Sequence, residues 1–421
     1  MFMKKTVKDF GGIVGLGILA AVFMGGCELT KPAKGITMAE TFGSDLAFLK
    51  RHTEVIVLSS GNGRAQVAVS GALQGRVMTS TAEGAQGLSY GWIKRELIAS
   101  GENDPHINAY GGEDRFWLGP EGGQFSIFFT KGDPFDLEHW FTPPPINEQA
   151  FEVVAREKDR VVFQKKMRLT NYSDTNFDLE LTREIKLLTP SEINDKLGIA
   201  PSGGVKTVAF QSDNVVTNTG QEAWIRQTGL LSIWILGMFK PSASTTVVIP
   251  FYTGSEAERG PIVNDAYFGK APPEQLVVKA EAGVLFFRGD GKLRNKIGLS
   301  PQRARSMLGS YDAAHQVLTL VQYNQPQGVT DYVNSMWQFQ EKPYAGDVVN
   351  SYNDGPAAPG AEPFGPFYEL ETSSPALTLK PGQSARHVHR TFHFQGPEEQ
   401  LDEIARAALG VPLAEIKTAL K

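Results

Sequence analysis

The segment GPFYELETSSPALTLKPGQSARHVHRTFHFQG, residues 365–396, decides the predicted fold. It predicts three strands separated by turns that contain Pro and Gly: Phe367–Glu371, Ala376–Leu379 and Ala385–Phe394. Side chains alternate between the two faces of a strand, so the last strand has an apolar face and an imidazole face. The apolar face carries Val388, Phe392 and Phe394. The imidazole face carries His387, His389, Thr391 and His393. One face is suited to a core, and the other is unusually rich in imidazole.

The same alternation recurs upstream. It is clearest in Val161–Leu169 and Phe177–Leu187, which flank a turn at Asn171–Asn176 and predict an antiparallel pair with one buried face and one wet face. Further predicted strands are Glu54–Leu58, Arg64–Ser70, Gly75–Thr79, Phe125–Phe129, Leu230–Phe239, Thr245–Tyr252, Gln275–Ala280, Val284–Phe287 and Val317–Tyr323. With 44 Gly and 25 Pro residues and no long helical periodicity in its middle, the chain is predicted to be all-β.

Helices are expected only near the two ends of the chain. Thr37 and Glu40 have the spacing of a capping box, which predicts a helix that reaches about Arg51. Pro397 marks the start of a second helix, Gly410 its end, and Pro412 the start of a short last helix. The segment 350–360, which contains two prolines, is expected to be a loop.

The N-terminus predicts an envelope lipoprotein. Lys4, Lys5 and Lys8 precede an apolar run and the small residues before Cys27, which is the pattern of a secretory signal. Cys27 is the single cysteine, which suits a lipidated N-terminus and excludes an internal disulfide. We therefore expect a signal peptide at 1–26, a tether at 27–36 and one domain at 37–421, on the periplasmic face or at the outer membrane. The alternative is a cytosolic protein with a hydrophobic start.

Charge argues against nucleic acid as a partner. The chain has 41 basic and 46 acidic residues, and removal of the leader leaves 38 and 45, so the formal charge changes from −5 to −7. Such a surface has no electrostatic footprint for nucleic acid. No phosphate-binding loop, dinucleotide-binding glycine pattern, cysteine pair or HExxH metal motif is present in the sequence.

Three motifs resemble the galactose-mutarotase-like β-supersandwich proteins: LQGRVMTS (73–80), GGEDRFWLGPEGG (111–123) and TGLLSIWILGMF (228–239). With FGPFYELE (364–371) and HVHRTFHF (387–394), nearly the whole mature chain resembles a family of bacterial lipoproteins that share a domain of unknown function. The resemblance implies one large antiparallel β-supersandwich with short terminal helices and a concave face that accommodates carbohydrate. Aldose epimerases also use a mid-chain histidine, and no histidine occurs here between His139 and His315. The epimerase mechanism is therefore not expected to carry over intact.

Glu369, Glu371, His387 and His389 are the predicted catalytic residues. Glu369 and Glu371 share one face of their strand, and a glutamate of raised pKa near imidazoles is suited to general acid–base catalysis. Their position late in the chain matches where mutarotase-like proteins keep their base. The alternative is an acidic face that balances Arg386 and Arg390.

A metal site on the histidine strand is the less favoured hypothesis. His387 and His389 lie about 6.5 Å apart along a strand, so both reach one ion, whereas His393 is too far along. Further ligands would have to come from Glu369, Glu371 or His106. We expect no metal and no cofactor, with imidazoles that bond sugar hydroxyls or carboxylates.

The predicted substrate-binding residues lie mainly in the glycine-rich segment and near it. Arg115 is suited to clamp a hydroxyl or carboxylate, and Trp117 and Trp140, with Pro143–Pro145 nearby, are suited to wall a pocket against a sugar face. The remaining candidates are His106, His393 and Asn353. Each has a structural alternative, since an Arg–Trp pair can lock a loop and Asn clusters are often turn residues.

Three functions remain open at this point. The first is a lipid-anchored envelope protein that isomerises or cleaves carbohydrate. The second is a noncatalytic glycan-binding lipoprotein, and the third is a structural envelope protein with a buried polar network. Fold alone does not choose among them, because one architecture hosts several activities.

Overall fold

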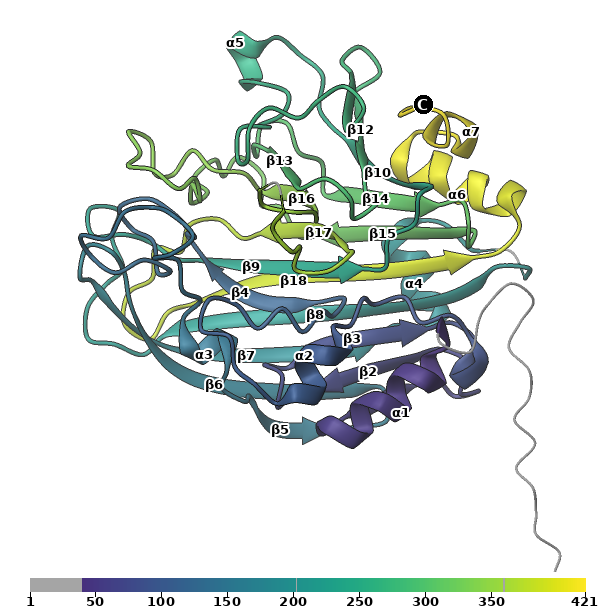
Figure 1. Ribbon diagram of the computed structural model, residues 1–421, viewed down its shortest axis with the longest axis horizontal. Helices are drawn as coiled ribbons and strands as arrows, with labels where there is room; N and C mark the ends of the chain where they lie inside the picture. The colour runs from purple at the N-terminus through teal and green to yellow at the C-terminus, as the bar shows by residue number, and fades with distance from the viewer. Residues whose placement is uncertain (1–39, 202, 359) are drawn as a thin grey trace, which may run out of the picture. The chain divides into compact units, whose positions relative to one another are not determined.

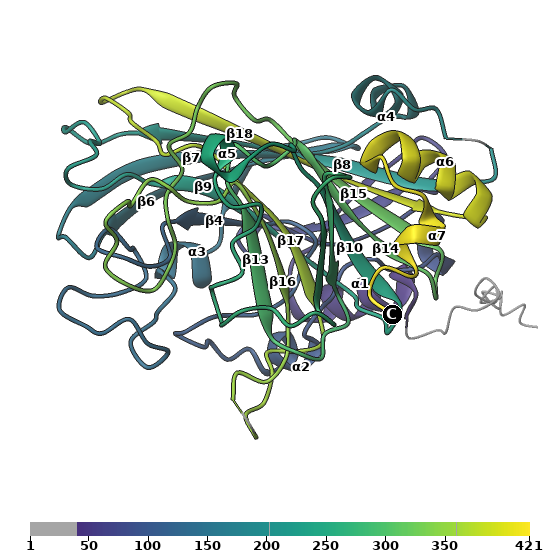
Figure 2. The same ribbon diagram turned by 90° about the horizontal axis from the view of Figure 1, so that it is seen from above.

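Two large antiparallel sheets make up most of the described structure (Figures 1 and 2). A computed structural model describes residues 40–201, 203–358 and 360–421, all of which belong to the unit Pro32–Lys421. The predicted all-β class with short helices is confirmed. The leader, Cys27 and Thr37 lie outside the described residues. Among the helices that are described, none combines the length and apolar character needed to cross a membrane.

The larger sheet has ten strands in the order β11-β12-β10-β14-β15-β18-β8-β7-β6-β5. In chain order these strands are β5 (Glu152–Arg156), β6 (Arg160–Thr170), β7 (Asn176–Leu187), β8 (Lys206–Asn218), β10 (Thr245–Pro250), β11 (Leu276–Lys279), β12 (Val284–Arg288), β14 (Met307–Asp312), β15 (Val317–Tyr323) and β18 (Ser384–Gln395). The predicted β6–β7 pair is confirmed, and along β7 every second side chain is buried. The long strands β8 and β18 pair over their whole length near the centre of this sheet.

The smaller sheet has five strands in the order β13-β16-β17-β9-β4. In chain order these are β4 (Arg115–Gly119), β9 (Ser232–Phe239), β13 (Asn295–Leu299), β16 (Val349–Asn353) and β17 (Tyr368–Ser373). A third sheet joins β1 (Ile56–Ser59), β2 (Gln66–Ser70) and β3 (Arg76–Thr81) in a meander. Figure 2 shows β13, β16 and β17 running beside one another.

The described helices are short. They are α1 (Phe42–His52), α2 (Arg95–Ser100), α3 (Pro144–Asn147), α4 (Pro190–Leu197), α5 (Glu256–Arg259), α6 (Glu398–Leu409) and α7 (Leu413–Ile416), with a 3-10 turn at Gly84–Gln86. The two longest of the described helices, α1 and α6, lie near the ends of the chain as predicted, but α2 to α5 lie in its interior, where no helix was predicted. Helix α6 follows Pro397 and ends at Gly410, which adopts the left-handed conformation that favours glycine (φ 74°). Helix α1 begins later than predicted, because Thr41 is its N-cap and accepts a hydrogen bond from the backbone of Ser44.

The two large sheets pack on each other through apolar side chains. One cluster unites Leu370 of β17 and Phe239 of β9 with Phe287 of β12, Leu308 of β14 and Val321 of β15, and all five are buried. On the opposite side of the ten-stranded sheet, Phe392 and Phe394 of β18 pack with residues of α6 and α7 (Figure 1). Both faces of β18 are therefore covered, and its imidazole face lies in the core rather than on an accessible surface.

Several predicted boundaries are wrong. The glycine-rich segment forms its strand at β4, upstream of the predicted strand Phe125–Phe129, which is irregular. The predicted strand Ala376–Leu379 contributes a single bridge, from Leu377 to Leu231. The segment predicted as a loop begins with β16, which is fully buried and pairs with β13 and β17.

Candidate functional site

The register of the five-stranded sheet gathers charged and aromatic side chains on the face that points away from the ten-stranded sheet. Tyr352, Glu369 and Met238 lie side by side across β16, β17 and β9. In the next row toward the other end, Glu371 pairs with Leu236, which pairs with Arg115 of β4. Because strand side chains alternate, all of these residues share one face.

Glu369 and Arg115 are buried and hydrogen-bonded to each other at the centre of this face. Nη2 of Arg115 lies 3.2 Å from Oε1 of Glu369, and the two side chains are 3% and 7% exposed. The indole of Trp117 covers one face of the guanidinium, with its ring centre 4.0 Å from Cζ of Arg115. Stacking of this kind suits Arg because its guanidinium is planar and weakly hydrated.

Glu371 is held by two donors from other strands of the same sheet, Lys296 of β13 and Trp234 of β9. Its Oε2 accepts a hydrogen bond from Nζ of Lys296 at 3.0 Å and from Nε1 of Trp234 at 2.9 Å. The ammonium group of Lys296 also lies 4.7 Å from the ring centre of Trp234. The negative charge of Glu371 is thus paired inside the protein, which a buried carboxylate requires.

Burial raises the pKa of Glu369 to about 8, with Glu371 adding to the rise while Arg115 and Lys296 oppose it. Burial also raises the pKa of Glu121, whose side chain lies near Lys296 and Glu371. Burial lowers the pKa of Lys296, but the negative charge of Glu371 and of other nearby carboxyl groups raises it by more. The pKa of Lys296 therefore lies above its ordinary value, and the amine stays charged. Two nearby carboxyls therefore differ: Glu369 is largely protonated near neutral pH, and Glu371 is salt-bridged.

A narrow pocket of about 70 Å³ opens above Glu369. Four tryptophans line the pocket: Trp117, Trp140, Trp234 and Trp337. Its rim includes Leu137 and Phe268, whose side chains are 46% and 40% exposed. The pocket thus combines charged groups at its base with aromatic faces at its walls, as small-molecule sites commonly do.

Several buried polar atoms at this pocket have no hydrogen-bond partner among the described residues. They are Nε and Nη1 of Arg115, Nε1 of Trp140 and Nε of Arg294. Buried polar groups are usually paired, so a concentration of unpaired ones at one pocket points to a polar ligand. All of these atoms are donors, so oxygen atoms are the partners they require.

The structure brings together five of the predicted site residues, four of them at the pocket and Glu371 behind it. Arg115, Trp117, Trp140 and Glu369 line the pocket. His106 does not, but its Nδ1 lies 2.6 Å from the backbone oxygen of Trp140, and its ring stacks on Phe141 at 4.4 Å. It therefore supports the loop that carries Trp140.

His387 and His389 lie on the other side of β17 from the carboxyls, so the expected convergence of the four predicted catalytic residues is wrong. Oγ1 of Thr372, which points into the core, lies 2.8 Å from Nε2 of His387 and 2.9 Å from Nδ1 of His389. Both histidines have no exposed surface. Burial lowers the pKa of His387 to about 3 and that of His389 to about 4, so both rings are neutral. They form part of the packing between the sheets.

His393 and Asn353 also lie elsewhere. Nε2 of His393 lies 2.8 Å from Oε2 of Glu113, and its ring stacks on Tyr90 at 4.3 Å, beside a second cavity. Asn353 donates to Asp290 and to the backbone of Leu293, which fixes the turn before β13. Within the described residues, no group of three or more His, Asp or Glu side chains is arranged to hold a metal ion.

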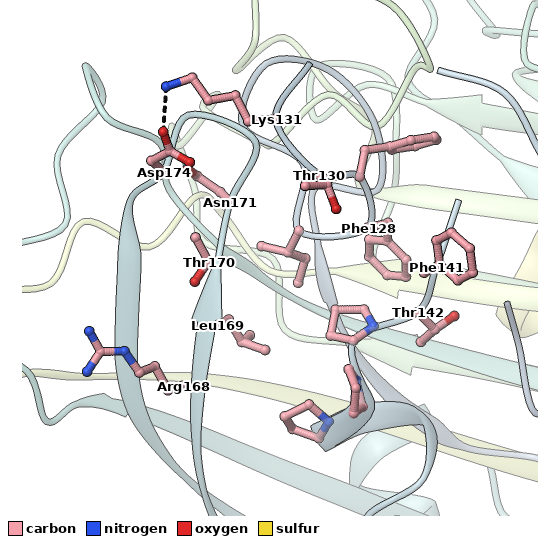
Figure 3. Close-up of a pocket in the computed structure, with 15 residues that line it drawn as sticks. Phe128, Thr130, Lys131, Phe141, Thr142, Arg168, Leu169, Thr170, Asn171 and Asp174 are labelled. Carbon is pink, nitrogen blue, oxygen red and sulfur yellow. Dashed lines mark hydrogen bonds and ion pairs between the residues drawn. The ribbon is translucent and has the colours of Figure 1, made fainter. Parts of the chain in front are cut away.

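The predicted proline wall belongs to a neighbouring cavity of about 300 Å³, shown in Figure 3. Pro143–Pro145 line it together with Phe128, Phe141 and Thr142, while Arg168 and Asn171 lie on the facing hairpin. Lys131 and Asp174 form an exposed ion pair at its edge (Figure 3). The prolines therefore lie outside the pocket that contains Trp117 and Trp140.

Sequence reasoning missed Lys296, Trp234, Glu121, Arg294 and Trp337. Trp234 lies within the motif TGLLSIWILGMF, and Glu121 within GGEDRFWLGPEGG, so both motifs were noticed while these side chains were not assigned. Lys296 is a lysine in the buried strand β13, with a side chain only 9% exposed. A lysine in an apolar strand is the signal that could have identified it.

Comparisons with known proteins give likenesses in fold at low identity. An Escherichia coli K12 protein described as a proposed aldose 1-epimerase is 12% identical, with a TM-score of 0.48 over 82% of this chain and 99% of that one. A galactose mutarotase related enzyme from Lactobacillus acidophilus is 10% identical, with a TM-score of 0.42 over 81% and 97%. A galactose mutarotase-like protein from Lactobacillus casei is 11% identical, with a TM-score of 0.42 over 81% and 100%.

These likenesses say nothing of the chemistry at the pocket. No curated protein sequence matches the chain. A family model does match, and it covers residues 40–420, which is almost all of the described structure. The chain therefore belongs to the family of unknown function DUF6786.

Proposed function

We propose that this protein binds a carbohydrate in the pocket above Glu369 and transfers a proton to it from that carboxyl group. The observation that carries the proposal is the pair of buried glutamates on β17, one with a raised pKa and the other salt-bridged. The unpaired donors of Arg115 and Trp140 suit the oxygen-rich edge of a sugar. The tryptophan faces suit its apolar C–H face.

The proposed chemistry begins at an acetal oxygen of the sugar. Glu369 donates its proton to that oxygen as the bond to the anomeric carbon breaks, and the oxygen keeps the electron pair. The carboxylate left on Glu369 then takes a proton from the hydroxyl group or water that adds to the anomeric carbon. Ring opening of an aldose and cleavage of a glycoside share this first step.

A noncatalytic glycan-binding protein is the second candidate. The observation that favours it is the number of aromatic side chains around the pocket, with Leu137 and Phe268 exposed at the rim. In that case Glu369 and Arg115 serve as hydrogen-bonding groups only. The two candidates differ in whether a bound sugar changes chemically.

Proton NMR of the purified full chain in detergent, mixed with aldoses, uronic acids and short glycosides, tests the proposal. We expect faster exchange of anomers or cleavage of a glycosidic bond. The Glu369→Gln variant should lose the chemistry and still broaden the sugar signals. Glu281→Gln, on the exposed turn between β11 and β12, is the matched control and should behave as the wild type.

Broadening without chemistry in the wild type would favour the binding protein. Full activity in Glu369→Gln would exclude Glu369 as the proton donor. If no sugar in the panel showed anomer exchange, bond cleavage or line broadening, a carbohydrate function of either kind would be contradicted.

We also propose that the protein is held at a membrane by lipid on Cys27. What supports this is the basic and apolar leader that ends at the single cysteine of the chain. Labelled palmitate fed to cells should enter the wild type and not Cys27→Ser, and the variant should leave the membrane fraction. Label in the variant, or a wild type found in the soluble fraction, would contradict the anchor.

A further inference from the structure

The charged side chains around the Glu369 pocket favour a negatively charged ligand. The charged residues that line it are Arg115, Arg294, Lys296, Glu121 and Glu369. Lys296 is already paired with Glu371, which lies behind it at 3.0 Å. Arg115 and Arg294 then face Glu121 and Glu369, and Glu369 is largely protonated near neutral pH because burial raises its pKa. Protonated Glu369 accepts a hydrogen bond from Arg115 but supplies it with no negative charge, whereas Arg294 also lies near the carboxyl group of Asp354.

Arg115 has the geometry to receive an anion. It uses Nη2 for Glu369, while Nε and Nη1 have no partner among the described residues. The side chain is 3% exposed and lines the pocket, and Trp117 covers one face of it. Both edges of a guanidinium that can bind two oxygens include Nη2, which carries two hydrogens. With one of them directed at Glu369, the other hydrogen and one of the two unpaired nitrogens form an edge that can bind two oxygens of one planar group.

We propose that the sugar bound at Glu369 carries a carboxylate, as a uronic acid does, and that Arg115 binds this carboxylate. The inference rests on the proposed carbohydrate function and names the substrate class of the same site. A neutral sugar would offer hydroxyl oxygens to Arg115 but would leave the charge of the guanidinium unpaired in a buried site, which is costly. A guanidinium binds carboxylate and phosphate alike through two parallel hydrogen bonds, and the carboxylate, as the smaller group, suits so narrow a pocket better.

Calorimetric titration of the full chain at pH 7 tests the inference with matched ligands. The series is glucose and galactose, the corresponding uronates, the uronamides, and the hexose 6-phosphates. We expect at least one uronate to bind about tenfold or more tightly than its neutral hexose, which corresponds to about 1.4 kcal/mol. The uronamide, which has the same shape without the charge, should lose this advantage.

Variants of Arg115 separate charge from geometry. Arg115→Met should abolish the preference for the uronate, and Arg115→Lys should keep a reduced preference, because an ammonium group lacks the planar fork. Arg386→Met is the control, since Arg386 is an exposed arginine that pairs with Asp213 on β8 and should keep the full preference. If Arg115→Met does not fold, the comparison of uronate with uronamide on the wild type still decides the matter.

The outcomes separate this inference from the function on which it rests. Equal affinity for neutral hexoses and uronates, or a preference for the hexose phosphates, would overturn the acidic-sugar assignment and leave a carbohydrate function standing. Absence of binding by every sugar would overturn both.

Discussion

Nη2 of Arg115 lies 3.2 Å from Oε1 of Glu369, although 254 residues separate them in the chain. Strand β9 lies between their strands, β4 and β17, and sets the register that brings them together. The pair joins the two segments that carry the most distinctive motifs of the sequence. It also means that the electrostatic state of Glu369 depends on Arg115, which gives the first prediction.

We expect Glu369 to titrate far above an ordinary glutamate. Its pKa is raised to about 8, so it is protonated at neutral pH, and activity that needs this proton should fall as the pH rises through about 8. Because Arg115 lowers this pKa, Arg115→Met should raise it further. Because Glu371 raises it, Glu371→Gln should lower it. Carbon NMR of labelled glutamate carboxyls, beside a pH–activity profile, measures both shifts, and titration of Glu369 near 4.5 in the wild type would refute the assignment.

Removal of one charge from the pair of Lys296 and Glu371 should lower the free energy of unfolding. Lys296 is 9% and Glu371 0% exposed, so Lys296→Met leaves a buried carboxylate without its counter-charge and should lower the free energy of unfolding by about 3–5 kcal/mol. The control is Lys279→Met, in an exposed pair with Glu415 at 2.8 Å, which should cost at most about 1 kcal/mol. Denaturant unfolding followed by circular dichroism measures both.

A double variant tests the same explanation. Lys296→Met combined with Glu371→Met removes both charges and should recover most of the lost stability, because no buried charge is left unpaired. Equal losses in Lys296→Met and Lys279→Met would show that burial of the first pair has no energetic consequence.

The buried histidines should make the protein sensitive to acid. Burial lowers the pKa of His387 to about 3 and of His389 to about 4, whereas both rings titrate near 6.5 in the unfolded chain. Their contribution to stability is therefore complete above pH 6.5 and is lost as the pH falls toward 4, at about 2 kcal/mol for each ring by pH 5. The urea midpoint should drop between pH 7 and pH 5.

Substitution of one ring isolates its share of this effect. Between pH 7 and pH 5, the free energy of unfolding of His389→Gln should fall by about 2 kcal/mol less than that of the wild type. His139→Gln, which changes a partly exposed ring, should not make this fall smaller. A wild type with the same stability at both pH values would contradict the buried neutral state of the two histidines.

Alternation along single strands could be predicted from the sequence, but the layers that cover each strand could not. In β18 the assignment of His387 and Phe392 to opposite faces is correct, yet both faces are buried, because α6 and α7 cover one and the five-stranded sheet covers the other. Period-two patterns show which residues share a face and not how many layers follow. The imidazoles were therefore assigned to a surface.

Strand β8 escaped prediction for a related reason. Its inward face carries Ser212 and Asn214, which pair across the ladder with His389 and His387 and are fully buried. This polar layer continues to Arg183, which bonds Asp114 inside the core. Because hydrophobic periodicity is the main signal of a buried strand, a strand that buries polar groups against other polar groups does not show it. In the candidate site, Arg115, Trp117, Trp140 and Glu369 were all singled out from the sequence and line one pocket, while Lys296 and Trp234 come from strands that only the tertiary fold brings near.

Two tryptophans of the pocket should respond differently to the same substitution. Nε1 of Trp234 donates to Glu371 at 2.9 Å, whereas Nε1 of Trp140 is buried and has no partner among the described residues. Trp234→Phe and Trp140→Phe both lose part of an indole ring, but only the first also removes a hydrogen bond to a charged group, which contributes about 1.5–3 kcal/mol. Trp234→Phe should therefore be the more destabilising in chemical denaturation.

Sugar affinity should show a separate effect. Trp140→Phe should weaken binding about fivefold if its N–H donates to the ligand, because one hydrogen bond contributes about 1 kcal/mol. Unchanged affinity in Trp140→Phe would remove this indole from the proposed set of ligand donors and leave Arg115 as the group on which recognition depends.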